Sequence, residues 1–207
     1  RHRINRGREW EFLFGGDGMF VATDEKDKDV FYAGYQYGNY YRAEKGDFKF
    51  ITPKHDLGQP GLRWNWRTPL IQSPHNHEIF YMGSQYVHRS LDRGDHWEQL
   101  SADLTTDREQ GNVPYSTISA LAESPLKFGM LWVGTDDGRI HLTTDHGNTW
   151  KRVDEGLPQN LWVGHVFPSP HDQQTAFASL TGYRNDDFNA YVFRTTDAGK
   201  TWTSITG

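Results

Sequence analysis

Short apolar segments recur along this 207-residue chain, and each closes on a small residue. The element occurs four times, as FYAG at 31–34, FYMG at 80–83, LWVG at 131–134 and AFAS at 176–179. A Ser-Pro pair stands ahead of three of them, at Ser73–Pro74, Ser124–Pro125 and Ser169–Pro170. Proline presets a turn and cannot serve a central strand ladder, so each pair predicts a turn that leads into a strand. No segment has the length and periodicity of a helix.

A second repeated element is a polar turn that ends on tryptophan. It occurs as SLDRGDHW at 90–97, TTDHGNTW at 143–150 and TTDAGKTW at 195–202. Its aspartates, Asp92, Asp145 and Asp197, follow one another at intervals of 53 and 52 positions. Self-similarity at such a period is typical of propellers and repeat arrays.

Together the two elements predict four similar units, at about residues 15–52, 66–101, 116–154 and 162–206, with no second domain. Each unit reads as four short antiparallel strands, which is the blade of a β-propeller. We therefore expect an all-β fold. Two alternatives stay open, a closed four-bladed ring and a segment of a larger propeller. We favour the segment because no strand is obviously shared between the two ends to close a ring. A plain β-sandwich would not require near-identical turns at constant spacing.

The repeated turn is expected to be structural. Its aspartate can accept hydrogen bonds from backbone N–H groups, its glycine can adopt a positive φ, and its tryptophan can be buried between blades. Three equivalent aspartates, one per blade, cannot converge on one small substrate, which argues against catalysis. The structural set is Asp92, Gly94, Trp97, Asp145, Gly147, Trp150, Asp197, Gly199 and Trp202. The first unit keeps Gly46 but has Glu44 at the aspartate position and no tryptophan, so we expect a looser turn there.

Composition excludes several classes of partner. The formal net charge is −5 and no run of lysine or arginine occurs, so neither nucleic acid nor an anionic lipid surface is expected. The longest apolar stretches are far shorter than a membrane span. The chain has no cysteine, and we expect neither a metal nor another cofactor. The histidines of the Ser-Pro turns, His75, His77 and His171, are more typical of a solvated surface than of a metal site.

The three tryptophan turns resemble the Asp-box, or BNR, repeats that sialidases, xyloglucanases, sortilin-type propellers and a photosystem II assembly factor share. Together with GGDGMFVATD, RWNWRTPLIQSPH, GTDDG and YRNDDFNAYVFRTTDAGKTW, they are most similar to the sortilin-like or BNR-type propellers of large secreted bacterial proteins, often labelled glycosyl hydrolase-like. The resemblance covers essentially the whole chain. It implies a multi-bladed parent protein that is secreted, periplasmic or on the cell surface, and it implies no particular reaction.

In a propeller, the loops between blades and the loops between the second and third strands share one face, and we expect function there. These loops collect aromatic rings beside polar groups, which suits a sugar or a peptide because a ring covers an apolar face and polar groups fix orientation. The candidate ligand-binding residues are Tyr37, Trp64, Trp66, Arg67, Tyr115, Arg139, Trp162 and Arg184. The alternative is that the tryptophans pack the seams between blades and the charges are solvated.

The resemblance to xyloglucanases also implies a glycoside hydrolase, which needs two carboxyl groups that flank the bond. Xyloglucanases carry an aspartate just after the second strand of a blade, and Asp136 in GTDDG is the matching residue. Asp17 is the carboxylate that we pair with it. The equivalent loops of the first two units hold Gln36 and Gln85, which departs from that pattern. Our first hypothesis is therefore an exported propeller that acts as a binding or assembly module for glycan or protein ligands. The second hypothesis is a glycoside hydrolase.

Overall fold

The computed structural model describes residues 15–24, 26–108, 111 and 113–206. These residues form four antiparallel sheets of four strands each, so the expected all-β fold of four-stranded blades is confirmed. Blade 1 contains β1 (Ala22–Thr23), β2 (Val30–Tyr35), β3 (Asn39–Glu44) and β4 (Asp47–Phe50); blade 2 contains β5 (Leu70–Gln72), β6 (Phe80–Gly83), β7 (Val87–Ser90) and β8 (Glu98–Gln99). Blade 3 contains β9 (Ile118–Glu123), β10 (Leu131–Thr135), β11 (Ile140–Thr143) and β12 (Lys151–Arg152); blade 4 contains β13 (Trp162–Pro168), β14 (Ala176–Gly182), β15 (Asp187–Thr195) and β16 (Thr203–Ser204).

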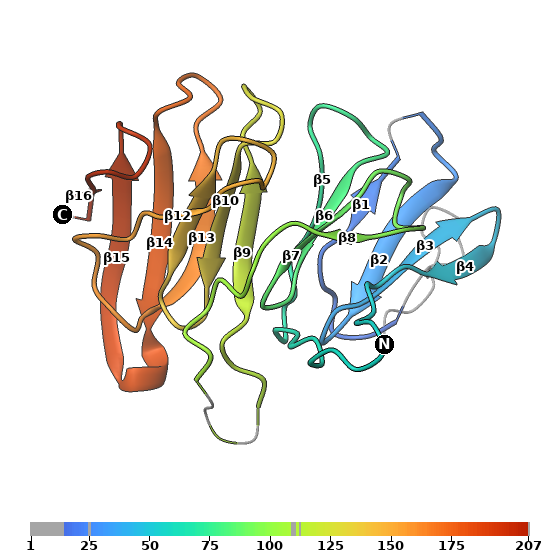
Figure 1. Ribbon diagram of the computed structural model, residues 1–207, viewed down its shortest axis with the longest axis horizontal. Coiled ribbons are helices and arrows are strands. Elements are labelled where there is room, and N and C mark those ends of the chain that lie inside the picture. The colour runs from blue at the N-terminus through green and yellow to red at the C-terminus, as the bar shows by residue number, and fades with distance from the viewer. Residues whose placement is uncertain (1–14, 25, 109–110, 112, 207) are drawn as a thin grey trace, which may run out of the picture.

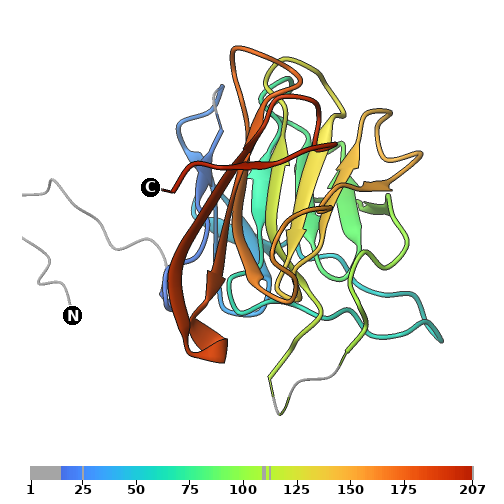
Figure 2. The same ribbon diagram turned by 90° about the vertical axis from the view of Figure 1, so that its left-hand side faces the viewer.

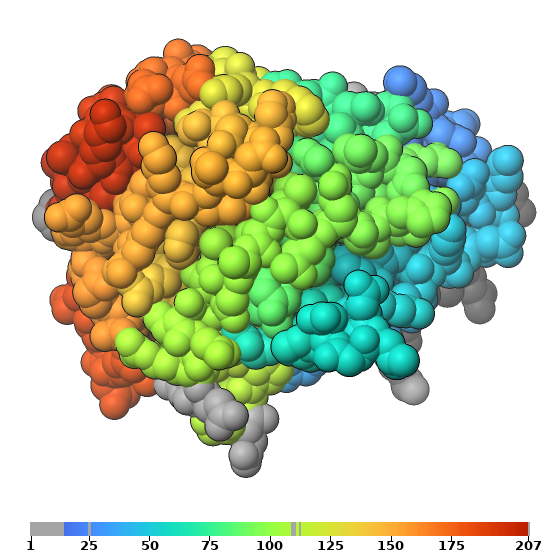
Figure 3. Space-filling model, viewed as in Figure 1, coloured from blue at the N-terminus to red at the C-terminus, as the bar shows by residue number. Residues whose placement is uncertain are grey.

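The four blades stand side by side in chain order, as the colours from blue to red show in the ribbon and on the surface (Figures 1 and 3). Within each blade the strands follow one another in the order of the sequence. The first strands of neighbouring blades contact each other, β5 with β9 and β9 with β13. This is how propeller blades are arranged around a common axis. A single 3₁₀ turn, Tyr183–Asn185, joins β14 to β15, and no helix of the described residues is long and apolar enough to cross a membrane.

The burial patterns of β6, β10 and β14 follow from the number of blades that cover each strand. The strands β6 and β10 lie between two neighbouring blades and are buried at every position. The strand β14 in the last blade alternates instead, with Ala176, Ala178 and Leu180 buried and the residues between them half-buried. A strand with two covered faces is apolar throughout, whereas one with a single covered face shows a period of two.

Apolar clusters fill the three seams between blades. In the first seam the ring centroids of Tyr32 and Phe80 are 4.3 Å apart. The third seam is built on Trp132, which is fully buried and has the Trp202 ring in edge contact at 6.2 Å. Each Å² of apolar surface removed from water stabilises by about 25 cal/mol, so these large rings dominate the association of the blades.

The three Asp-box turns share one set of backbone hydrogen bonds. In the second box, Asp145 accepts from the N–H and the hydroxyl of Thr149 at 2.9 and 2.6 Å, while Gly147 donates its N–H to Thr143 Oγ1 at 3.0 Å. Each box tryptophan then donates its indole N–H to a carbonyl of the preceding blade, Trp97 to Ile51, Trp150 to Leu100 and Trp202 to Val153, at 2.6, 3.0 and 2.6 Å. The box therefore closes a turn in one blade and fastens that blade to the one before it.

The box glycine is required for two reasons. At Gly199 the φ is +82°, a conformation that side chains rarely adopt. A Cβ at that position would also lie 2.8 Å from the Cβ of Val153 in the preceding blade. Gly94 and Gly147 have similar φ values, +88° and +91°, and face the equivalent residues of their own preceding blades.

The first blade departs from the expectation of a looser turn. Its strands β3 and β4 stay paired up to Glu44 opposite Asp47, so Lys45 and Gly46 alone form the turn, with φ of +52° and +88°. The expectation was wrong because a two-residue hairpin with positive φ at both central residues matches the twist of its strands and needs no capping aspartate.

Candidate functional site

The loops that were expected to share one face do lie together. Tyr37 in the β2–β3 loop donates its backbone N–H to the carbonyl of Trp66, between blades 1 and 2, at 3.2 Å. Asn185 in the β14–β15 loop donates to the carbonyl of Asn160, between blades 3 and 4, at 3.4 Å. We call this edge of the blades the loop face. In Figure 1 it is the lower edge, where the β14–β15 hairpin ends.

Two aromatic side chains are exposed next to each other on the loop face. The rings of Tyr37 and Trp66 meet edge to face with 5.4 Å between centroids, and they are 38% and 47% exposed. Tyr37 and the following Gly38 have φ of +59° and +72°, so the hairpin turns sharply at this point. The neighbouring Arg67 is exposed and its guanidinium lies 4.7 Å from the centroid of the Phe20 ring. Three of the predicted ligand-binding residues are thus brought together.

The Asp17 carboxylate belongs to the same end of the loop face. It accepts a hydrogen bond from the side-chain amide of Gln36, the residue before Tyr37, and it is exposed. The pair gives this area both hydrogen-bond donors and acceptors. Asp17 therefore lies with the aromatic pair Tyr37 and Trp66, and its hydrogen-bond partner is Gln36 and not the Asp136 with which the sequence paired it.

A second group of predicted residues gathers between blades 3 and 4. The guanidinium of Arg184 lies 4.3 Å from the centroid of the Trp162 ring, and its Nε donates to the hydroxyl of Tyr183 at 2.9 Å. Half-buried Tyr115 lies near them; burial, followed by the negative charges of Asp137 and Asp136, raises the pKa of its hydroxyl. These side chains form a mixed cationic and aromatic surface.

Asp136 is buried in the seam between blades 2 and 3, with 2% of its surface exposed. Its Oδ1 accepts from the backbone N–H of Thr117 at 2.8 Å, and its Oδ2 accepts from the Thr117 hydroxyl and from Asn65 Nδ2. Burial raises the pKa of this carboxyl to about 6, although the hydrogen bonds from Thr117 oppose the shift. The carboxylate consequently fastens two blades together and has little surface for a substrate to touch.

Trp64 and Arg139 make their contacts within the blades. Trp64 is half-buried, packs against the first seam, and has the His88 ring 5.9 Å away. Arg139 is half-buried and donates its backbone N–H to the Thr135 hydroxyl at 2.8 Å. For Trp64 the alternative stated from the sequence, packing of a seam, describes its contacts better than ligand binding does.

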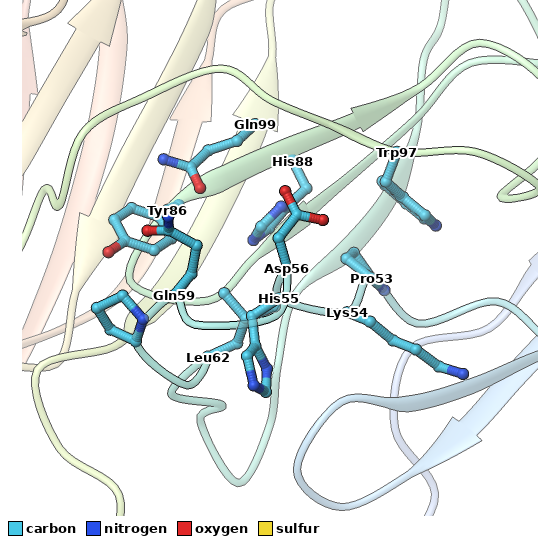
Figure 4. A pocket seen from close by; sticks show the side chains of 11 residues that line it. Pro53, Lys54, His55, Asp56, Gln59, Leu62, Tyr86, His88, Trp97 and Gln99 are labelled. Carbon is cyan, nitrogen blue, oxygen red and sulfur yellow. The ribbon is translucent and has the colours of Figure 1, made fainter.

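A groove that the sequence did not indicate lies beside blade 2 (Figure 4). It holds about 280 Å³ between the connection 53–62 and a wall that includes Tyr86, His88 and Trp97. Burial lowers the pKa of His88 to about 4, so this imidazole is neutral at physiological pH. In blade 3 the residue equivalent to His88 is His141 of β11. Each of the two histidines lies on the third strand of its blade and pairs with a residue of the fourth strand, His88 with Gln99 and His141 with Arg152. The repeated histidine was the available signal, but nothing in the sequence placed a connection over it.

Within the part of the chain that the structure describes, no three histidine, aspartate or glutamate side chains gather as a metal site would require. His75 and His77 instead contact neighbouring blades. His75 Nε2 lies 2.8 Å from the carbonyl of Ser124 in blade 3, and His77 Nδ1 lies 3.2 Å from Asp24 Oδ2 in blade 1. These histidines of the Ser-Pro turn therefore help to hold adjacent blades.

No protein-family model matches the chain. Among curated proteins it is similar to the xyloglucanase Xgh74A of Acetivibrio thermocellus, with 23% identity over 234 residues that cover 96% of this chain and 27% of the relative. The chain thus spans about a quarter of the length of this relative.

Two of the similar solved structures illustrate the shared fold. A GH74 xyloglucanase from Xanthomonas campestris superimposes with a TM-score of 0.61 and 21% identity, over 90% of this chain and 30% of that one. The structure described as YCF48 bound to D1 peptide gives a TM-score of 0.53 and 13% identity, over 92% of this chain and 54% of that one. At this identity the likeness shows the fold alone, a part of a β-propeller.

Proposed function

We propose that this chain is the ligand-binding part of a larger β-propeller and that its loop face engages a neutral glycan. The observation that carries the proposal is the exposed pair of rings, Tyr37 and Trp66, at 5.4 Å from each other. Large rings are normally buried, and an exposed ring offers a flat apolar face of the kind that covers one side of a sugar ring. The edge-to-face contact holds the Tyr37 and Trp66 rings in a fixed orientation to each other.

The polar neighbours of the pair support a glycan rather than an apolar ligand. The Asp17 carboxylate and the Gln36 amide supply acceptors and donors that suit sugar hydroxyl groups. The similarity to xyloglucanases supports xyloglucan as the first glycan to test.

The experiment is calorimetric titration of the chain with xyloglucan oligosaccharides. We expect Trp66→Ala to weaken binding by about tenfold or more, which corresponds to about 1.4 kcal/mol. Phe167→Ala is the matched control, because Phe167 is an aromatic residue of blade 4 that is 58% exposed and lies near the end of β13 that is remote from the loop face. Unchanged affinity in the Trp66→Ala variant, with both variants melting as the parent does, would refute the proposal.

Salt distinguishes a neutral glycan from an acidic ligand. A neutral glycan neutralises no charge, so added salt should leave its affinity unchanged. For an acidic sugar or a peptide carboxylate, Arg67 or Arg184 would dominate through charge-assisted hydrogen bonds, and affinity would fall with salt. The propeller described as bound to a D1 peptide makes the peptide the first alternative ligand.

A glycoside hydrolase is the second candidate, supported by the activity named for the curated relative. It requires a substrate to reach Asp136, whose surface is 2% exposed, and a second carboxyl such as Asp17 close by. New reducing ends released from xyloglucan, and abolished by Asp136→Asn in a variant that stays folded and still binds the oligosaccharide, would support it. Export of the parent protein stays a prediction, which cell fractionation checks.

A further inference from the structure

The outward face of blade 4 carries apolar side chains that nothing covers among the described residues. Figure 2 looks toward this blade, and β14 and β15 lie in front of the other sheets. Phe167 on β13 is 58% exposed, Phe177 on β14 and Val192 on β15 are half-buried, and Ile205 after β16 is 51% exposed. These four residues define the terminal face.

The position of Phe177 is covered in every other blade. Phe177 pairs across β14 with Phe167 and Arg194, as Trp132 pairs across β10 with Ala122 and Leu142. Trp132 is completely buried by blade 4, and the residues at the corresponding positions of blades 1 and 2, Tyr32 and Tyr81, are also completely buried. The exposure of Phe177 is therefore a property of the last blade and not of this position in the repeat.

Ile205 occupies the position that receives an Asp-box in the other blades. Its backbone N–H donates to Val192 at 2.9 Å, just as Leu100 donates to Val87 and Val153 to Ile140, both at 2.8 Å. The carbonyls of Leu100 and Val153 accept the indole N–H of the next box tryptophan. The box glycine packs on the side chains of the same two residues.

We propose that the terminal face docks a further four-stranded blade of the Asp-box type, next in order around the ring. Its box tryptophan donates to the carbonyl of Ile205, and its box glycine packs on the Ile205 side chain. The interface continues a contact that the chain already makes three times. The curated relative is long enough for further blades, since this chain covers 27% of it.

A second copy of this chain does not fit the face. Head-to-tail association would bring blade 1 of the second copy against it, and the corresponding turn of that blade is the two-residue hairpin Lys45–Gly46. Blade 1 also has lysine and phenylalanine, not tryptophan, in its fourth strand, DFKF. No indole would then reach the carbonyl of Ile205.

The test extends the full chain with a second copy of residues 155–206, placed directly after Thr206. Because Thr206 corresponds to Asp154, the added copy follows blade 4 at the same distance along the chain at which blade 4 follows blade 3. The chain has no cysteine, so Phe167→Cys gives a single thiol whose maleimide labelling rate reports coverage of the face. We expect the extension to slow this labelling by about tenfold or more. Leu126→Cys, on the Ser-Pro turn of blade 3 and 47% exposed in the parent residue, is the control that should label equally with and without the extension.

A matched extension separates docking through the box from mere proximity. It carries Gly199→Val and Trp202→Ala in the added copy only, and we expect it to leave labelling of the Phe167→Cys variant fast. The proposal would be overturned if both extensions slowed the labelling of the Phe167→Cys variant equally, or if neither slowed it. It would also be overturned if the unmutated extension added no β-sheet signal in circular dichroism. In the unextended chain, labelling should not slow as protein concentration rises. Slowing would show that a second copy occupies the face.

Discussion

Replacing Asp136 by asparagine should change the pH dependence of stability in a defined direction. Asp136 is buried and its folded-state pKa is raised by burial from 3.8 to about 6. Between these two pH values the folded chain keeps a proton that the unfolded chain has released. Stability therefore falls as pH rises through this window, because the unfolded state binds fewer protons. The asparagine variant has no such titration.

The magnitude follows from the shift in pKa. A difference of about 2 units corresponds to about 3 kcal/mol, which the parent chain loses between pH 4 and pH 7 and the variant does not. The carboxamide can still accept from Thr117 N–H, but its Nδ2 would face the Nδ2 of Asn65, also a donor. That cost does not depend on pH, so it shifts the variant's curve without changing its slope relative to the parent.

The assay is urea denaturation of both proteins at several pH values from 4 to 7, with the difference in unfolding free energy plotted against pH. All other titrating groups are common to the two proteins, so most of their contributions cancel in the difference. We expect the difference to move in favour of Asp136→Asn by about 3 kcal/mol as pH rises. If the difference in unfolding free energy does not change with pH, or moves in favour of the parent, burial does not raise the pKa of Asp136 and the argument is refuted.

The remaining predictions concern the Asp-boxes and the second seam. For Asp145→Asn the difference in stability from the parent should depend on pH in the opposite direction. Hydrogen bonds from Thr149 lower the pKa of Asp145 to about 2, so the stability that this carboxylate contributes in the parent is present above pH 3.8 and is lost as pH falls toward 2. Acid denaturation of both proteins checks this. Trp150→Ala should destabilise by about 3 kcal/mol in urea denaturation, through lost apolar burial and the lost bond to the preceding blade; less than 1 kcal/mol would contradict the proposed fastening. Gly147→Val should lower the melting temperature more than Gly156→Val, because both glycines have positive φ but only Gly147 has a neighbour in contact. Glu123→Ala should cost about 3 kcal/mol, since its buried carboxylate accepts from three donors; a smaller loss than that of the exposed-site variant Glu98→Ala would contradict this.

The sequence by itself determined the elements and the Asp-box contacts. The box depends on hydrogen bonds between residues two and four positions apart, such as Thr143 with Asp145 and Asp145 with Thr149. Such contacts need only the conformation of a few successive residues, and the repeated letters specify that conformation. The assignment of loops to one face also followed from the sequence, because consecutive antiparallel strands place alternate loops at opposite edges.

The candidate site was predicted only in part. RWNWR contains two tryptophans, and both were expected to bind ligand, but Trp64 is half-buried against the first seam whereas Trp66 is 47% exposed. The tight hairpin at Lys45–Gly46 was not predicted, because this turn is only two residues long and does not correspond to an Asp-box. The groove over His88 was missed because a connection from the preceding blade forms one of its walls.

Only the tertiary structure decided the role of Asp136. The letters GTDDG are compatible with an exposed catalytic loop, yet Thr117 and Asn65, which are 19 and 71 positions away in the chain, meet this carboxylate and enclose it. Burial of a side chain depends on which distant segments arrive beside it. Local sequence determines the shape of a turn, whereas the packing of one blade on the next determines whether the turn faces solvent or a seam.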